Sequence, residues 1–216
     1  VGQGGGDEEF ALGHRACASW VVGETVGAGG PAAWSARRPA RGEHYFSWRA
    51  IVVAHTGTLV IHEHDIDLAR TTDALAIAEL SRDAIEYGLA WRWTARRVMR
   101  CIHDADSNVV VVRQGIGVAA FAIMQYGEEE AHLSLLAVRA TRRRTGMGSA
   151  LMNWLDATAR VAAIQAIRLE VRITNPGAMA FYRRHGFEES GVAVGYYEGV
   201  EDAVRMSKRL AAPDAG

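Results

Sequence analysis

Two strand-to-helix junctions constrain the fold of this chain more than any other part of its sequence. In the first, the apolar run 133–138 leads through a basic turn to Gly146 and Gly148 and then into an amphipathic segment. In the second, the alternating run 167–173 leads to Asn175 and a short helical pattern. Strands that lead directly into helices are typical of a mixed α/β domain, in which each helix N-terminus offers unpaired N–H groups near the sheet edge.

The two glycines of the first junction predict a phosphate cradle. Gly146 and Gly148 permit backbone conformations and close approaches that a Cβ would block, and a helix N-terminus is a ready anion site. The spacing fits neither the dinucleotide fingerprint nor a Walker A loop. A solvated turn that binds nothing is the alternative, although four arginines lie close by: Arg139, Arg142, Arg143 and Arg144.

The second junction combines an alternating strand with a capped helix. Within 167–173, the period of two places Glu170 on one sheet face together with Arg168 and Arg172. Asn175 is expected to cap the next helix, with proline at its first position and glycine just past its end. The two arginines are expected to lower the pKa of the glutamate and weaken it as a base, and an ion pair across the sheet surface is the alternative role.

Motifs across both junctions together resemble the GNAT superfamily of N-acetyltransferases. They are R-x-x-G-x-G from Arg143, L-E-V-R-x-x-N from Leu169 and A-x-x-x-Y-x-x-x-G-F from Ala178. The ending, in which Tyr196-Tyr197 precedes a Glu-Asp-Ala segment, is similar to the RimI type, the bacterial N-terminal acetyltransferases that modify a ribosomal protein. The resemblance covers roughly residues 59–210.

The resemblance implies an α/β (α+β) fold, with a mixed, mostly antiparallel twisted sheet flanked by helices and with splayed central strands. It also implies acetyl-CoA as cofactor, with the pantetheine arm along the end of the first strand and the pyrophosphate on the glycine turn. The implied cofactor-binding residues are Leu136, Ala137, Val138, Arg143, Arg144, Thr145, Gly146, Met147, Gly148, Ser149, Asn175 and Tyr182.

By the same resemblance, Glu170 is the general base and Tyr182 the general acid of a direct acetyl transfer in a ternary complex. At pH 7 about 14% of an α-amine is neutral, against roughly 0.04% of a lysine amine, so a protein N-terminus needs only a weak base. A tyrosine hydroxyl can hydrogen-bond or protonate the departing thiolate. A core aromatic is the alternative role of Tyr182, and His132 is a secondary candidate for proton handling.

The expected acceptor is the N-terminal α-amine of a protein or peptide, of the ribosomal-protein type. One departure loosens this inference, because RimI-type sequences often carry arginines where this chain has the Gly-Val-Ala-Val-Gly run 191–195. A small amine, such as a polyamine or an antibiotic, is the nearest alternative acceptor, and a non-catalytic sensor of acyl-CoA is an alternative of another class. Arg96-Arg97 with Trp91 and Trp93 is interpreted as a helix face near the acceptor site.

Composition divides the chain into an extension, a domain and a tail. Residues 1–57 are rich in glycine and lack sustained periodicity, which predicts a poorly ordered or loosely docked extension; an interaction module is the alternative. Residues 58–211 carry the acetyltransferase pattern, and 212–216 form a C-terminal tail. The elements expected ahead of the first junction are strands near 59–61 and 66–69, a helix capped by Thr72-Asp73, a helix over 90–102 and a hairpin around Gln114-Gly115.

Charge and composition argue against several other classes of protein. The formal net charge of −1 and the pI of about 6.8 give no case for attraction to nucleic acid or to an anionic membrane. No apolar run approaches the ~18–20 residues of a membrane span, and two distant cysteines fit a reducing compartment, so a cytoplasmic protein is expected. His62–Asp67 could hold a metal ion, but no second cluster completes a coordination shell, and a polar strand edge is the preferred interpretation. The oligomeric state is left open.

Overall fold

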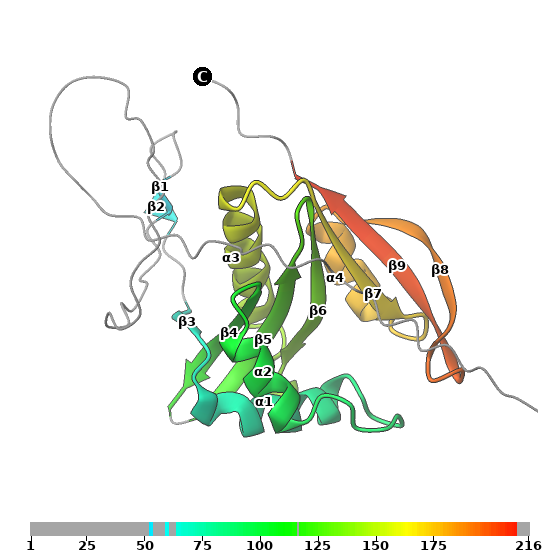
Figure 1. The fold of residues 1–216 in the computed structure, drawn as a ribbon, viewed down its shortest axis with the longest axis horizontal. Coiled ribbons are helices and arrows are strands. Elements are labelled where there is room, and N and C mark those ends of the chain that lie inside the picture. The colour runs from blue at the N-terminus through cyan, green and yellow to red at the C-terminus, as the bar shows by residue number, and fades with distance from the viewer. Residues whose placement is uncertain (1–51, 54–58, 61–63, 116, 211–216) are drawn as a thin grey trace, which may run out of the picture.

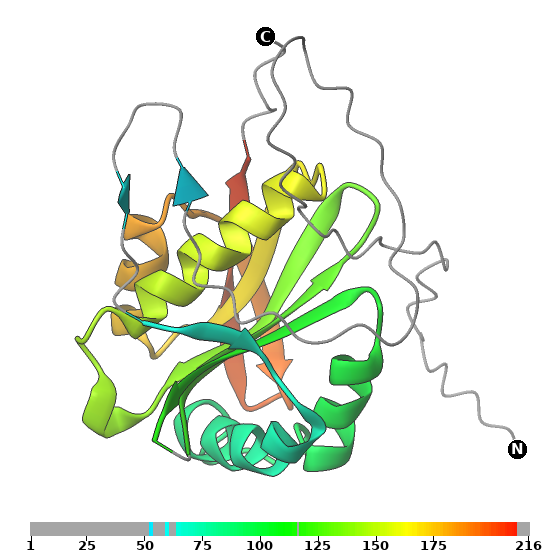
Figure 2. The same ribbon diagram turned by 90° about the vertical axis from the view of Figure 1, so that its left-hand side faces the viewer.

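A seven-stranded sheet with helices on both faces forms the body of the protein (Figures 1 and 2). The computed structural model describes residues 52–53, 59–60, 64–115 and 117–210. The strand order is β3-β4-β5-β6-β7-β9-β8, and every neighbouring pair is antiparallel except β6 and β7. The elements are β3 (Ile66–Leu68), η1 (Thr71–Asp73), α1 (Ala74–Ala84), α2 (Ala95–His103), β4 (Ser107–Gln114), β5 (Gly117–Tyr126), β6 (Glu130–Val138), η2 (Ala140–Arg142), α3 (Met147–Val161), β7 (Ala166–Arg172), α4 (Pro176–Arg184), β8 (Glu188–Tyr197) and β9 (Glu201–Arg209).

A separate two-stranded ladder joins β1 (Val52–Val53) to β2 (Leu59–Val60). β1 belongs to the segment predicted to be an extension, and the remainder of that segment lies outside the described residues, as does the whole of the predicted tail.

Two hydrophobic clusters cover the two faces of the sheet. One lies under α3 and α4 and includes Leu151, Leu155 and Phe187, and the other lies under α1 and α2 and includes Ile77 and Phe121. Figure 2 shows α3 and the α1–α2 pair on opposite sides of the sheet. The predicted mixed, mostly antiparallel sheet flanked by helices is therefore confirmed.

The two central strands separate soon after they pair. β6 and β7 are in register only from Glu130↔Ala166 to His132↔Arg168, although β6 continues to Val138. Beyond His132 neither strand bonds to the other, so the sheet has an opening at its centre. This is the predicted splay, and it places the ends of both strands, with the helices that follow them, around one gap.

A β-bulge at Ser134 reverses the side-chain alternation of β6. Leu133 pairs with Met124 while Leu135 pairs with Ile123, so Ser134 is the extra residue. As a result Leu133 packs under α3 and α4, whereas Leu135 packs under α1 and α2. Residues before and after the bulge thus present their partly exposed side chains to opposite faces of the sheet.

The helices that follow the two junctions begin where the sequence predicts. Gly146 precedes α3 with φ 86°, a left-handed conformation that favours glycine. Asn175 caps α4 because its Oδ1 accepts a hydrogen bond from the Ala178 N–H at 3.0 Å. Pro176 is the first residue of α4, and Gly186 follows the helix with φ 83°.

Two predictions about the first helices are wrong in detail. The helix expected from residue 90 begins at Ala95, where Thr94 caps it by accepting a hydrogen bond from the Arg97 N–H. Asp73 does precede α1, but its carboxylate does not cap that helix. It accepts two hydrogen bonds from Arg113 instead, at 2.6 and 2.8 Å, and one from the Arg70 N–H at 2.6 Å, which caps the preceding turn η1.

Candidate active site

A cavity of about 790 Å³ opens at the gap between β6 and β7. Its walls come from the end of β6, the turn into α3, the end of β7, the first turns of α4, the segment that joins α1 to α2, and the end of β8. The sheet is split at this point, so the cavity reaches side chains that belong to both of its faces.

Eleven of the twelve residues predicted to bind the cofactor line this cavity. Thr145 does not. Its hydroxyl donates to the carbonyl of Arg142 at 2.7 Å, and its own carbonyl lies 2.6 Å from Nε2 of His64. The remaining residues of the set line the cavity from the end of β6, the turn into α3 and the junction of β7 with α4: Leu136, Ala137, Val138, Arg143, Arg144, Gly146, Met147, Gly148, Ser149, Asn175 and Tyr182.

The start of α3 fits a phosphate group. Arg142, Arg143 and Arg144 line the cavity beside the helix N-terminus, whose N–H groups and dipole favour an anion. A Cβ added to Gly148 would lie 3.4 Å from the Phe181 ring, at the near limit of ordinary van der Waals contact, so α3 and α4 pack closely here. The donor set and the close backbone approach together suit a pyrophosphate.

Glu170 projects from β7 into the cavity and is held by two side chains. Its Oε2 lies 2.7 Å from Nε2 of His132 and accepts a hydrogen bond from the Tyr196 hydroxyl at 3.3 Å. The hydrogen bond with His132 lowers the pKa of the Glu170 carboxyl below its usual value, and this effect outweighs burial, which raises it. The carboxyl is therefore ionised at neutral pH.

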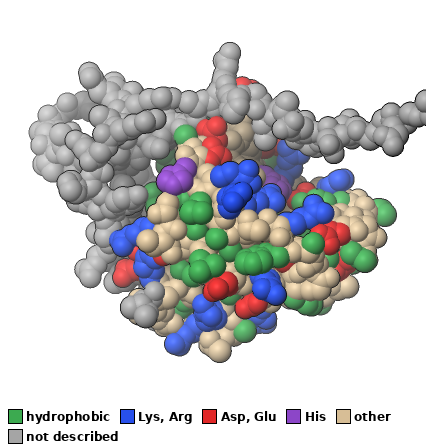
Figure 3. Space-filling view, turned by 60° about the horizontal axis from the view of Figure 1, so that its bottom comes forward, with side chains coloured by type: hydrophobic (Ala, Val, Ile, Leu, Met, Phe, Trp, Pro, Cys, Tyr) green, Lys and Arg blue, Asp and Glu red, His purple; other side chains and the backbone are tan. Residues whose placement is uncertain are grey.

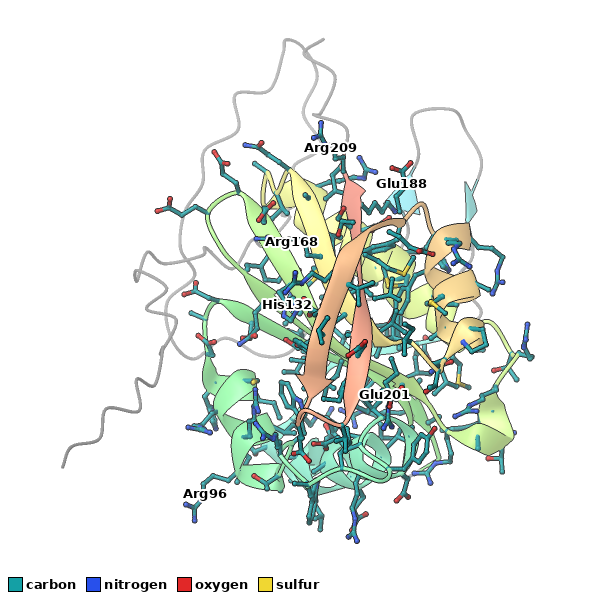
Figure 4. The ribbon with its side chains drawn as sticks, turned by 90° about the vertical axis from the view of Figure 1, so that its right-hand side faces the viewer. Arg96, His132, Arg168, Glu188, Glu201 and Arg209 are labelled. Carbon is teal, nitrogen blue, oxygen red and sulfur yellow. The ribbon has the colours of Figure 1, made fainter. Side chains whose placement is uncertain are left out.

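The two arginines expected to act on Glu170 are engaged elsewhere. Arg168 forms an ion pair with Glu130, and Arg172 forms one with Glu201 at 2.7 Å. The predicted cause of the pKa shift is thus wrong, although the predicted direction is correct. The histidine that causes the shift is His132, which Figure 4 shows close to Arg168, its ladder partner across the β6–β7 pair.

Tyr182 belongs to the core and to the cavity wall at once. It lies on α4, with its ring edge-on to Phe181 at 5.2 Å and to Phe187 at 5.6 Å. Burial raises the pKa of its hydroxyl, which stays protonated at neutral pH. Among the described residues this hydroxyl makes no hydrogen bond, so it is available to a ligand in the cavity.

Glu170 and Tyr182 approach the cavity from different faces of the sheet. Leu169 and Val171, the neighbours of Glu170, pack under α3 and α4 together with Tyr182, so Glu170 projects toward the α1–α2 side. Both side chains nevertheless line the same cavity, because β6 and β7 are separated there. A carboxylate and a phenol can therefore act on two sides of one ligand.

Tyr196 and Tyr197, at the end of β8, are site residues that the sequence analysis did not assign. Both line the cavity, and burial, together with the nearby Glu170 carboxylate, raises the pKa of Tyr196 to about 12. The paired tyrosines were recognised as a motif, but their position depends on how β8 pairs with β9. The short turn with Gly199 between the two strands is a local hairpin signal that the sequence analysis did not use.

The segment between α1 and α2 forms the cavity wall opposite α3. Glu86 is buried and accepts hydrogen bonds from the backbone N–H groups of Arg92 and Trp93, at 2.8 and 3.1 Å. Glu198, beyond β8, accepts from the Ala90 N–H at 3.1 Å and from Arg92 Nε at 2.9 Å. These bonds join two parts of the chain that are remote in sequence into one rim.

The Arg-Trp cluster predicted as a helix face is divided by the structure. Trp91 and Trp93 lie in the segment before α2, and Arg97 stacks over the Trp93 ring at 3.9 Å beside the cavity. Arg96 points away from the site into solvent (Figure 4). On the face shown in Figure 3, basic and acidic side chains are interspersed, so this face has no continuous positively or negatively charged surface.

The part of the chain that the structure describes contains neither a metal site nor a membrane-spanning helix. There, no group of three or more histidine, cysteine or acidic side chains is arranged to bind a metal ion. His62 and Glu63 lie outside that part. Within the same ranges, no helix combines the length and the apolar character needed to cross a bilayer.

Comparison with known proteins identifies the family. The model of the acetyltransferase (GNAT) family matches residues 72–187. The [ribosomal protein bS18]-alanine N-acetyltransferase of Escherichia coli K12 is 38% identical over 145 residues, which cover 66% of this chain and 95% of the relative. An N-alpha-acetyltransferase of Sulfurisphaera tokodaii is 35% identical over 157 residues, covering 68% and 94%.

A solved structure agrees with these relatives. The crystal structure of the ribosomal-protein-S18-alanine N-acetyltransferase from Escherichia coli matches 70% of this chain and 96% of its own, with a TM-score of 0.61 and 28% identity. The chain therefore belongs to the acetyltransferase (GNAT) family, which uses acetyl-CoA, and it is an N-acetyltransferase.

Proposed function

We propose that this protein transfers an acetyl group from acetyl-CoA to the N-terminal α-amine of a protein, with a ribosomal protein as the acceptor class. The proposal rests on one observation above all: a single cavity joins the anion-binding start of α3 to Glu170 and Tyr182. The names of the relatives from Escherichia coli and Sulfurisphaera tokodaii support the α-amine as acceptor. A ribosomal acceptor would also place the reaction in the cytoplasm.

The residues on the α3 side of the cavity would hold the cofactor. The N–H groups that follow Gly146, together with Arg143 and Arg144, would bind the pyrophosphate, and the end of β6 from Leu136 to Val138 would run beside the pantetheine arm. When bound, acetyl-CoA supplies an acetyl thioester, so that a C–N bond forms as the C–S bond breaks.

Two side chains of the protein would move the protons of this exchange. Glu170 would receive the proton that the acceptor nitrogen loses, since its carboxylate is ionised and faces the cavity. Tyr182 would give its proton to the departing sulfur, since burial keeps its hydroxyl protonated. Both groups are then restored by exchange of one proton each with solvent, so the reaction leaves the protein unchanged.

A panel of acceptors with matched chemistry tests the proposal. One peptide begins with a free alanine; a second is the same peptide with a blocked N-terminus and an internal lysine; spermidine and an aminoglycoside represent small amines. We expect acetylation of the first peptide alone, at its α-amine, detected by mass spectrometry and by release of free thiol. Turnover of small amines alone would contradict the α-amine proposal, and tight binding of acetyl-CoA without turnover of any acceptor would favour a sensor.

A further inference from the structure

A chain of hydrogen bonds fixes which ring nitrogen of His132 carries a proton. The Ser134 hydroxyl has one hydrogen, and it donates that hydrogen to Oε1 of Gln125 at 3.0 Å. Nδ1 of His132 lies 3.2 Å from the same hydroxyl oxygen. Since the hydroxyl can then only accept, Nδ1 must be the donor, and the neutral ring is the Nδ1–H tautomer.

This tautomer has a consequence at the other ring nitrogen. Nε2 of His132 lies 2.7 Å from Oε2 of Glu170. Two lone pairs would repel each other at this distance, so a proton lies between the two atoms. Glu170 and His132 therefore share one proton in the arrangement that the structure shows. The pair can accept a proton from a substrate only after it has lost this shared proton.

The two partners differ in their access to solvent. Both side chains line the cavity, but the Glu170 side chain is 17% exposed and the His132 side chain is 41% exposed. A proton that reaches Glu170 can therefore pass to water through the more exposed imidazole.

The groups that face the pair from the neighbouring elements are arginines and a phenol. Arg168 on β7 is paired with Glu130, and Arg205 on β9 and Arg97 on α2 are the other cations nearby. The pKa of Tyr196 on β8 is raised to about 12. The Tyr196 phenol therefore keeps its proton at neutral pH, and the proton shared at this site lies between Glu170 and His132.

We infer that Glu170 and His132 act as one base, in which Glu170 receives the proton of the acceptor amine and His132 passes that proton to solvent. The inference rests on the proposed acetyl transfer and adds a positioning and relaying residue to it. The nitrogen loses one proton to the pair as its bond to the acetyl carbon forms, and the pair then loses one proton to water. A protonated pair does not turn over, because its basic site is already occupied.

Nuclear magnetic resonance tests the proton positions without any substrate. In protein labelled with ¹⁵N-histidine, two-bond ¹H–¹⁵N correlations distinguish the two neutral tautomers of His132, with His132→Gln used to assign its signals. We expect the Nδ1–H tautomer at high pH in the wild type, and a loss of this preference in Ser134→Ala, which lacks the acceptor for Nδ1–H. A neutral ring protonated on Nε2 in the wild type would overturn the inference.

The pH dependence of the reaction tests the relay. At pH values below the pKa of both the acceptor amine and the pair, log(kcat/KM) should rise with a slope of about 2 in the wild type, because both must lose a proton. His132→Gln keeps a hydrogen-bond donor near Glu170 but cannot titrate, so its slope should be about 1 with the same peptide, and its kcat/KM near pH 7 should fall by about 10- to 100-fold. His103→Gln, on the exposed end of α2, is the matched control and should keep the wild-type profile.

The outcomes separate this inference from the proposed function. If the wild type acetylates the peptide and His132→Gln gives a parallel profile, the histidine has a structural role only and the relay is wrong. If exogenous imidazole restores activity to His132→Ala but leaves Glu170→Gln inactive, the relay is supported. If the wild type acetylates no α-amine, the proposed function fails, whatever tautomer the ring adopts.

Discussion

Arg172 and Glu201 form an ion pair that joins β7 to β9 beside the cavity. Nε of Arg172 lies 2.7 Å from Oε2 of Glu201, and the two side chains are 11% and 16% exposed. The same guanidinium donates to the carbonyls of Ile85 and Tyr87, at 3.2 and 3.0 Å. One arginine thus fixes the segment between α1 and α2, which forms the far wall of the site, to the strand that carries Glu170.

We expect Arg172→Gln to loosen that wall and to destabilise the fold. The change leaves the Glu201 carboxylate and two carbonyl groups without their charged donor, which should lower the free energy of unfolding by about 2–3 kcal/mol. The KM for the acceptor should rise more than the KM for acetyl-CoA, because the cradle at α3 is not touched. Urea unfolding and steady-state kinetics measure both effects.

The matched control is Arg92→Gln. Arg92 also pairs with a glutamate, Glu198, but its side chain is 68% exposed, and exposed ion pairs contribute little to stability. If Arg92→Gln lowered the free energy of unfolding as much as Arg172→Gln does, solvent exposure would not determine how much these two ion pairs contribute to stability.

Asp73 should make stability depend on pH through its bonds with Arg113. Burial raises the pKa of the Asp73 carboxyl, but hydrogen bonds from Arg113 and from the Arg70 N–H outweigh it and hold the pKa below its usual value. The stabilisation is therefore present above the unfolded pKa of about 3.9 and is lost as pH falls through the lower folded pKa. Asp73→Asn should lower the free energy of unfolding by about 2 kcal/mol at pH 7, and the difference from wild type should shrink at acidic pH. If the free energy of unfolding of Asp73→Asn differed from that of the wild type by the same amount at pH 7 and at pH 3, this role of Asp73 would be contradicted.

The helices after the two junctions could be predicted because their signals are local. The left-handed Gly146 and the cap formed by Asn175 act on residues within one turn of the helix. The start of α2 also has a local signal, the Thr94 cap, which the sequence analysis did not use. The N–H groups of Arg92 and Trp93 bond to the nearby Glu86 and that of Ala90 to the remote Glu198, so these carboxylates hold the preceding segment outside the helix.

The same distinction between local signals and remote contacts applies to the candidate site. Most predicted cofactor residues share one cavity wall because they surround a single strand-to-helix turn. The pairing of Glu170 with His132 depends on the register of β6 against β7 and on the bulge at Ser134, which involve residues 38 positions apart and have no local signal. Arg172 was misassigned for the same reason, since its partner Glu201 is supplied by β9.

Gly146→Ala should weaken cofactor binding and also lower the stability of the fold. Gly146 has φ 86°, which costs a residue with a Cβ roughly 1–2 kcal/mol. The strain should shift the first turn of α3, whose N–H groups face the cavity, and raise the Kd for coenzyme A by about tenfold, equivalent to ~1.4 kcal/mol. Calorimetry and thermal unfolding measure the two effects. Gly117→Ala, whose φ is not positive and whose Cβ would meet only the Gln114 carbonyl oxygen at 4.0 Å, is the control and should leave Kd unchanged.

Tyr182→Phe should reduce the rate of transfer while leaving the fold and cofactor affinity nearly intact. The ring contacts with Phe181 and Phe187 remain, and the hydroxyl makes no hydrogen bond to the described residues that the change would break. Loss of the acid should lower kcat by about 10²–10³-fold. Because burial raises the pKa of Tyr182, the wild-type kcat should not fall between about pH 8 and pH 10 through loss of this proton. Tyr126→Phe, which removes a hydroxyl bonded to Thr158 outside the cavity, should keep its kcat, and a Tyr182→Phe rate within twofold of wild type would exclude this phenol as the acid.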